Sequence, residues 1–130
     1  MGRRTDRKLG ALELRILNVL WESGPSTVRD VLEALQVKPR PAYTTVLTMM
    51  RLMHEKGYLT RKERGRAHVY QARLREQSVK RSILRDMRDS VFRGSAQALM
   101  VRLLEDEQLS AEDLARVKEL IEAIEQARAR

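Results

Sequence analysis

The stretch that decides the fold is residues 42–72, AYTTVLTMMRLMHEKGYLTRKERGRAHVYQA. In its first part apolar side chains recur at i, i+3, i+4 and i+7, namely Val46, Met49, Met50 and Met53. This spacing places them on one face of a helix, where methionines serve as flexible core fillers. Thr44, Thr48 and Arg51 then lie on the opposite face. The pattern predicts an amphipathic helix with a polar, threonine-rich outer side.

A short β-hairpin is predicted directly after this helix. Gly57 suits the left-handed residue that ends a helix, and residues 58–62 and 67–72 read as strands around a Glu-Arg-Gly-Arg turn at residues 63–66. Four cations gather near this turn: Arg61, Lys62, Arg64 and Arg66. Like charges this close repel each other unless solvent or a polyanion relieves the repulsion. The hairpin therefore favours a phosphate-rich partner.

Two further helices are predicted ahead of this stretch. Residues 10–22 carry an apolar stripe that ends at a Gly-Pro pair. A second helix starts after Thr27, with Asp30 in the capping-box position. The two prolines in residues 38–41, Lys-Pro-Arg-Pro, exclude a helix there and predict a turn. The second and third helices thus form a helix-turn-helix with the hairpin as its wing, and duplex DNA is the expected partner.

The charge distribution agrees with a nucleic-acid partner. The 130-residue chain has a formal net charge of +8 and a sequence pI near 10.4. Residues 1–74 hold 15 Lys/Arg against 7 Asp/Glu, whereas residues 75–130 hold 11 of each kind. Neutralisation of phosphates with release of counterions would supply most of the non-specific affinity of the first part. Residues 75–130 have no net charge, so we expect them to serve a function other than DNA binding.

Composition and motifs exclude several classes of protein. Cysteine is absent, so no disulfide or thiolate metal site is possible, which suits a reducing cytoplasm. No apolar run approaches the roughly 20 residues that span a bilayer, and the start lacks the apolar stretch of a signal peptide. His54 and His68 have no carboxylate cluster around them, and no phosphate loop or nucleophile elbow is present. We therefore expect a cytoplasmic protein that is not an enzyme and has no cofactor, metal or small-molecule substrate.

Residues 75–130 are predicted to be helical throughout, with apolar stripes that one small unit cannot bury by itself. The stripes comprise Val79, Ile83, Met87 and Val91, then Leu99, Met100, Leu103 and Leu104, and finally Leu114, Val117, Ile121 and Ile124. Ser110 and Asp113 provide the start signal of the last helix. Ordering costs roughly 1.5 kcal/mol per residue, so three short helices need more burial than they provide alone. A second copy would complete this core, and a two-fold dimer would present two recognition helices to a palindromic site.

The sequence thus predicts a mainly α-helical chain with a small β-hairpin wing. Residues 1–74 form a winged helix-turn-helix DNA-binding domain and residues 75–130 a helical dimerisation domain. The residues expected to contact DNA are Tyr43, Thr44, Thr45, Thr48, Arg51, Arg61, Lys62, Arg64 and Arg66. Hydroxyls can bond to base edges or phosphates, and a threonine methyl can lie against a thymine methyl. Tyr43 has two interpretations, a contact with the DNA backbone or packing against the proline turn.

Three segments resemble the BlaI/MecI/CopY family of bacterial transcriptional repressors, the penicillinase repressors. They are Ala42-Tyr43-Thr44-Thr45-Val46-Leu47-Thr48, Glu55-Lys56-Gly57-Tyr58-Leu59 and Gly65-Arg66-Ala67-His68-Val69-Tyr70. The first predicted helix, from Leu9 to Trp21, also resembles that of the family, and the likeness extends over nearly the whole chain. Two features depart from the family pattern. Leu52 stands where an arginine is expected, and the C-terminal cysteine motif of the copper-responsive branch is missing.

The resemblance implies a homodimer that binds a palindromic operator and blocks transcription, often of β-lactam resistance or copper homeostasis genes. In the β-lactam systems a membrane-bound sensor protease causes the repressor to be cut in its dimerisation region. A cut near residues 98–105 would separate the last helix from the DNA-binding part. Direct copper sensing is not expected without the cysteines.

Two other functions compete with that of a sequence-specific repressor. An architectural protein that binds DNA of any sequence would also use a basic wing, whereas a winged-helix module that contacts protein alone has no need of one. The outward threonines and Arg51 favour the reading of bases, although such a face can also be plain solvated helix surface. A footprint on the DNA upstream of the chain's own gene separates the first two functions.

Overall fold

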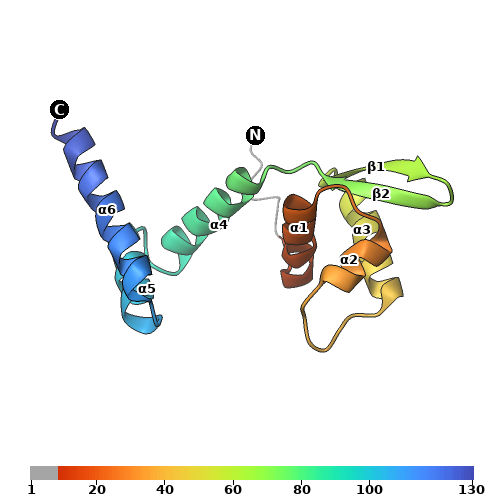
Figure 1. The fold of residues 1–130 in the computed structure, drawn as a ribbon, viewed down its shortest axis with the longest axis horizontal. Coiled ribbons are helices and arrows are strands. Elements are labelled where there is room, and N and C mark those ends of the chain that lie inside the picture. The colour runs from red at the N-terminus through yellow and green to blue at the C-terminus, as the bar shows by residue number, and fades with distance from the viewer. Residues whose placement is uncertain (1–8) are drawn as a thin grey trace. The chain divides into compact units, whose positions relative to one another are not determined.

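Across residues 9–130, the part of the chain described by this computed structural model, there are six helices and one two-stranded hairpin (Figure 1). The elements are α1 (Ala11–Ser23), α2 (Val28–Ala34), α3 (Tyr43–Glu55), β1 (Leu59–Arg64), β2 (Ala67–Ala72), α4 (Glu76–Ser90), α5 (Ala96–Asp106) and α6 (Ala111–Arg128). This order confirms the predicted mainly α-helical fold with a hairpin wing. The chain divides into two compact units at residues 83 and 84, within α4. The predicted functional boundary, at residues 74 and 75, precedes that helix.

Local signals in the sequence begin and end the first three helices. Thr27 and Asp30 form the predicted capping box at α2, each backbone amide donating to the other's side chain at 3.1 Å. Residues 35–42 form the connection to α3, and Arg40 stabilises it by donating from Nη2 to the carbonyl of Leu32 at 3.1 Å. Gly57 follows α3 with a φ of +85°, the left-handed conformation predicted for it.

The core of the first unit lies where the apolar faces of α1, α2 and α3 meet the hairpin. It contains Ile16, Leu17, Leu20, Val28, Val31, Leu35, Val46, Met50, Met53, Leu59 and Tyr70. Met49 was predicted to lie on the buried face of α3, but it is only partly buried, at the edge of this core. Trp21 donates from Nε1 to the carbonyl of Leu74 at 2.9 Å, which ties α1 to the segment after the hairpin. This packing fixes which side of α3 faces outward.

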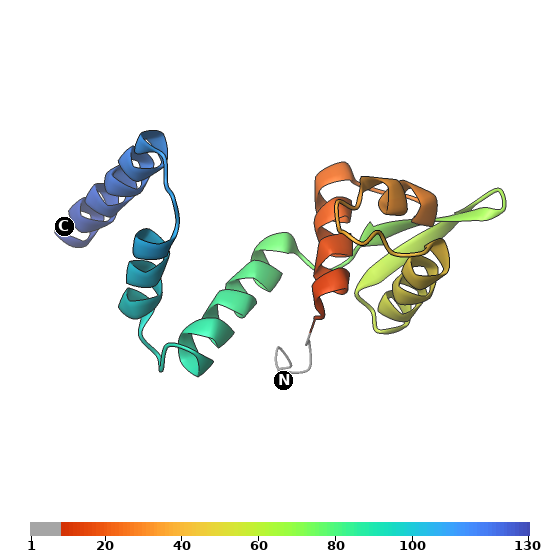
Figure 2. The same cartoon turned by 90° about the horizontal axis from the view of Figure 1, so that it is seen from below.

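The hairpin is longer and its turn tighter than predicted. β1 continues to Arg64, which pairs with Ala67, so the turn consists of Gly65 and Arg66 alone. Gly65 makes this possible with a φ of +62°, which glycine adopts without a steric penalty. The base of the wing is held by Ser26, whose backbone exchanges hydrogen bonds of 2.8 and 2.9 Å with Tyr70. The tip projects past the helices of this unit in both views (Figures 1 and 2).

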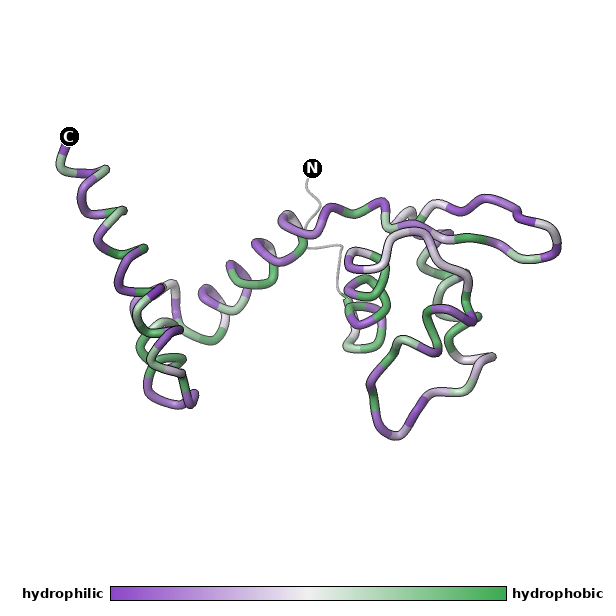
Figure 3. The backbone as a smooth tube through the Cα atoms, in the orientation of Figure 1, coloured by the Kyte–Doolittle hydropathy of each residue, from purple (hydrophilic) through white to green (hydrophobic). Residues whose placement is uncertain are grey.

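Residues 84–130 are helical, as predicted, but bury little of their apolar surface. Neither α5 nor α6 has a buried residue. The predicted start signal of α6 is present, since the side chain of Ser110 accepts a hydrogen bond from the backbone amide of Asp113 at 3.0 Å. Hydrophobic positions recur along both helices (Figure 3). The exposed residues of the predicted stripes are Met87, Val91, Met100, Leu103, Leu104, Leu114, Val117, Ile121 and Ile124. Ile83 and Leu99 are half-buried, and Val79 differs because it is already buried within one copy.

Along residues 9–130, no helix combines the length and apolar composition that crossing a membrane requires.

Candidate DNA-binding surface

The exposed surface of α3 includes all five residues of this helix that are predicted to contact DNA. Val46, Met50 and Met53 are fully buried and orient the helix. Thr44, Thr45, Thr48 and Arg51 lie away from these buried side chains and are exposed, and Tyr43, at the first residue of the helix, is exposed on the side of α2. Three threonine hydroxyls and a guanidinium are therefore exposed along the second helix of a helix-turn-helix, where base edges are read in this class of fold.

A shallow hollow lies within this face. It is lined by Thr44, Thr45, Thr48, Met49 and Leu52. Leu52 is 45% exposed although its side chain is apolar. It stands two turns beyond Thr44 on the same stripe of the helix, so this stripe is polar at its start and apolar at its end.

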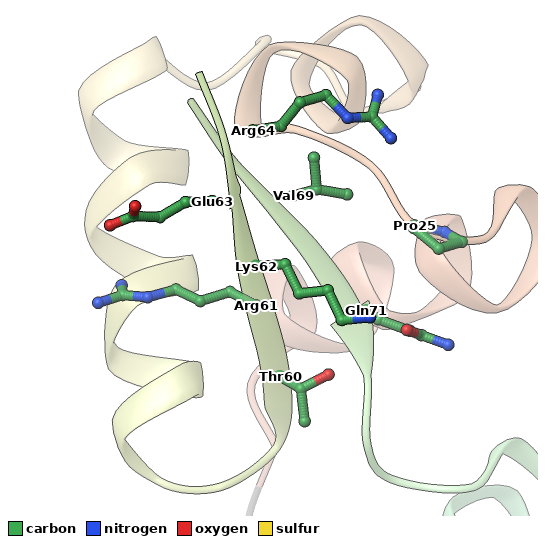
Figure 4. Close-up of a pocket in the computed structure, with 8 residues that line it drawn as sticks. All are labelled: Pro25, Thr60, Arg61, Lys62, Glu63, Arg64, Val69 and Gln71. Atoms are coloured by element: carbon green, nitrogen blue, oxygen red, sulfur yellow. The ribbon is translucent and has the colours of Figure 1, made fainter. Parts of the chain in front are cut away.

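The wing presents its cations on two opposite faces (Figure 4). Arg61 and Glu63 point towards α3, and Arg61 donates from Nη1 to the hydroxyl of Tyr70 at 3.4 Å. Lys62 and Arg64 point to the other side of the sheet, where a second hollow also involves Pro25 and Val69. The alternation of side chains along a strand imposes this division. The single crowded cationic tip expected from the sequence is therefore two separate sets of charges.

A third hollow connects α2, α3 and the wing. Its lining includes Arg29 from α2, Tyr43 from α3, and Arg66 and His68 from the hairpin. The Arg29 guanidinium lies 5.1 Å from the centroid of the Tyr43 ring, a cation–π geometry. Tyr43 thus packs against α2, while 40% of it is exposed. Sequence reasoning missed Arg29, because nothing in its own neighbourhood distinguishes it from a solvated helix residue.

The histidines of this region pack around Tyr70. His68 lies in β2, as predicted, with its ring 6.2 Å from that of Tyr70 and its Nδ1 buried without a hydrogen-bond partner. His54 meets the same ring edge-on at 6.5 Å and is half-buried rather than on the open helix surface. Within residues 9–130, no group of three or more His, Asp or Glu side chains is arranged to hold a metal ion.

The elements of the first unit define a winged helix-turn-helix fold. Among solved structures the chain is similar to a MarR family protein from Bacillus stearothermophilus, with a TM-score of 0.53 and 19% identity over 97% of this chain and 79% of the other. A transcriptional regulator from Thermotoga maritima gives a TM-score of 0.55 and 20% identity over 98% and 84%. At these identities the similarity concerns the fold alone.

The chain belongs to the penicillinase repressor family, whose sequence profile matches residues 9–123. It is 33% identical to the transcriptional regulator BlaI of Mycobacterium tuberculosis over 75% of this chain and 72% of BlaI. The methicillin resistance regulatory protein MecI of Staphylococcus aureus is 18% identical over 88% and 93%, and the penicillinase repressor of Bacillus licheniformis 23% over 85% and 86%. The resemblance noted in the sequence is confirmed, and the protein is a DNA-binding transcriptional repressor.

Proposed function

We propose that two copies of this chain bind a palindromic operator and repress transcription from the promoter that contains it. The observation that carries the proposal is the exposed face of α3, where the side chains of Thr44, Thr45, Thr48 and Arg51 are accessible to a partner. Arg66 at the wing tip and Arg29 on α2 flank the start of that helix. Side chains of the helix would read base edges, and the flanking cations would contact phosphates.

Dimerisation is supported by the second unit. Its exposed leucines, valines and isoleucines line helices that have no buried residue of their own in a single copy. Burial of apolar surface contributes a free energy of about 25 cal/mol per Å² removed from water. Packing of these exposed side chains against the same helices of a second copy would therefore stabilise a dimer. Isologous pairing of this kind gives the two-fold symmetry that a palindrome mirrors.

The names of the relatives support a proposal for the genes that this chain regulates. MecI is described as a methicillin resistance regulatory protein and the Bacillus licheniformis relative as a penicillinase repressor. We propose that this chain controls β-lactam resistance or related stress genes. Relief would follow a cut near residues 98–105 in α5, brought about by a membrane-bound sensor protease, because such a cut detaches α6 from the DNA-binding unit.

A footprint on the DNA upstream of the chain's own gene tests the proposal. We expect protection of one short segment with two-fold sequence symmetry, and loss of that protection when the symmetric halves are scrambled. Protection spread evenly over the fragment, unaffected by scrambling, would favour the alternative of an architectural protein that binds DNA of any sequence.

A further inference from the structure

Leu52 is an apolar side chain on the exposed face of a DNA-reading helix. Its neighbours along the stripe are Thr48, one turn earlier, and Thr44, two turns earlier, with Met49 beside them. All four line the same shallow hollow, and Leu52 remains 45% exposed. The described residues that line it are all uncharged. With Thr45, which also lines it, the surface inside the hollow is made of methyl, methylene and thioether groups beside three hydroxyls.

The major groove offers one apolar feature to such a surface. Guanine, adenine and cytosine present only hydrogen-bond donors and acceptors there, whereas thymine adds its C5-methyl group. A leucine neither donates nor accepts a hydrogen bond, so it gains nothing from the other base edges. Burial of a methyl against leucine removes apolar surface of both partners from water.

We propose that Leu52, together with Thr48 and Met49, is a specificity-determining residue that receives the C5-methyl of one thymine in each half of the bound site. The inference rests on the proposed function of α3 as the base-reading helix. It adds the class of base recognised and the residue that selects it. It also gives a role to a position that departs from the family pattern.

Replacement of thymine by deoxyuridine tests this directly, since it removes only the methyl group. The full-length chain first selects a duplex from a randomised synthetic pool, and each thymine of that duplex is then replaced in turn. We expect one thymine per half-site at which affinity falls about fourfold. That factor corresponds to about 0.8 kcal/mol for one buried methyl-sized group, at 1.36 kcal/mol per tenfold change.

Variants of the chain assign the effect to Leu52. In Leu52→Ala the ratio of affinities for the thymine and deoxyuridine duplexes should fall towards one, whereas Leu52→Met should preserve it. Arg51→Ala should weaken binding to both duplexes by the same factor. Leu84→Ala removes another exposed leucine, outside α3, and should leave the ratio unchanged.

Two results would overturn the proposal while leaving the repressor function intact: no thymine at which deoxyuridine lowers the affinity of the natural chain, or a ratio that persists in Leu52→Ala. If no sequence is enriched from the pool, sequence-specific binding itself fails, and this inference fails with it.

Discussion

The guanidinium of Arg29 lies 5.1 Å from the centroid of the Tyr43 ring, which joins the first turn of α2 to the first turn of α3. A cation–π contact between partly exposed groups contributes about 0.5 to 1 kcal/mol. The contact also brings a positive charge to the hollow that Arg66 lines from the wing. The start of α3 is thus flanked by two arginines from different elements, a suitable arrangement for a DNA phosphate.

A double-mutant cycle measures this contact. Arg29→Ala and Tyr43→Ala should each lower the free energy of unfolding, and their effects should fall short of additivity by about 0.5 to 1 kcal/mol. Tyr43→Phe keeps the ring and should keep the coupling. If Tyr43→Phe nevertheless weakens DNA binding, the hydroxyl contacts the DNA backbone. Strict additivity in urea titrations would mean that the two side chains do not stabilise each other.

The two faces of the wing lead to unequal roles for its arginines. Arg66 lines the hollow beside α3, whereas Arg64 points to the opposite side of the sheet. We expect Arg66→Ala to lower the slope of log affinity against log salt by about 0.9, the amount for one phosphate contact, on specific and random duplexes alike. Arg64→Ala should change the slope less. Equal slopes for the natural chain and for both variants would place the wing outside the DNA interface.

By its angular position around the helix, Thr48 is the threonine of α3 that points most directly away from the buried residues. If it contacts a base edge, Thr48→Ala should cost about 1 to 3 kcal/mol on the selected site and less on random DNA. Thr60→Ala removes another exposed threonine, from β1, and is the matched control. Competition binding decides between two roles. Equal losses on both duplexes would assign Thr48 to positioning on the DNA backbone instead.

The capping box at α2 stabilises the helix that supports α3. Thr27→Ala removes the acceptor for the amide of Asp30 and should lower the free energy of unfolding by about 1 kcal/mol. Thr27→Ser keeps the hydroxyl and should retain most of that stability. Denaturant titration followed by circular dichroism measures both. A Thr27→Ser variant as unstable as Thr27→Ala would attribute the loss to the threonine methyl rather than to the hydrogen bond.

The elements of the first unit could be predicted where local spacing and burial agree. Val46, Met50 and Met53 follow the helical period, and they are the residues that the core buries. The extension of β1 to Arg64 could not be predicted, because it depends on the φ of +62° that Gly65 adopts in the finished turn.

Contacts between side chains of different elements could not be predicted from the sequence. Arg29 and Tyr43 are 14 residues apart, and only the fold of the intervening loop brings them together. The hollow around Leu52 depends in the same way on the rotation of α3, which leaves Met49 only half-buried. The helical stripes of the second unit were predictable from period alone. What covers them is a property of the assembly and stays a prediction.

The apolar stripe on α6 allows a test of whether the chain forms a dimer through its second unit. Ile121 is 50% exposed in a single copy and belongs to the stripe with Leu114, Val117 and Ile124. An unpaired carboxylate in an apolar interface costs several kcal/mol, so Ile121→Asp should shift the full-length chain from dimer to monomer in sedimentation equilibrium. Ala123→Asp introduces the same charge on the opposite side of the helix, where it should leave the dimer intact.

The same pair of variants links assembly to DNA binding. Two DNA-binding units held in one dimer gain an effective concentration that raises affinity 100-fold or more over one unit alone. Ile121→Asp should therefore lose about that factor on a palindromic site but little on a single half-site, since α3 and the wing are untouched. Ala123→Asp should bind both as the natural chain does. A monomeric Ile121→Asp that holds the palindrome at full strength would separate dimerisation from operator binding and overturn the division of roles between the two units.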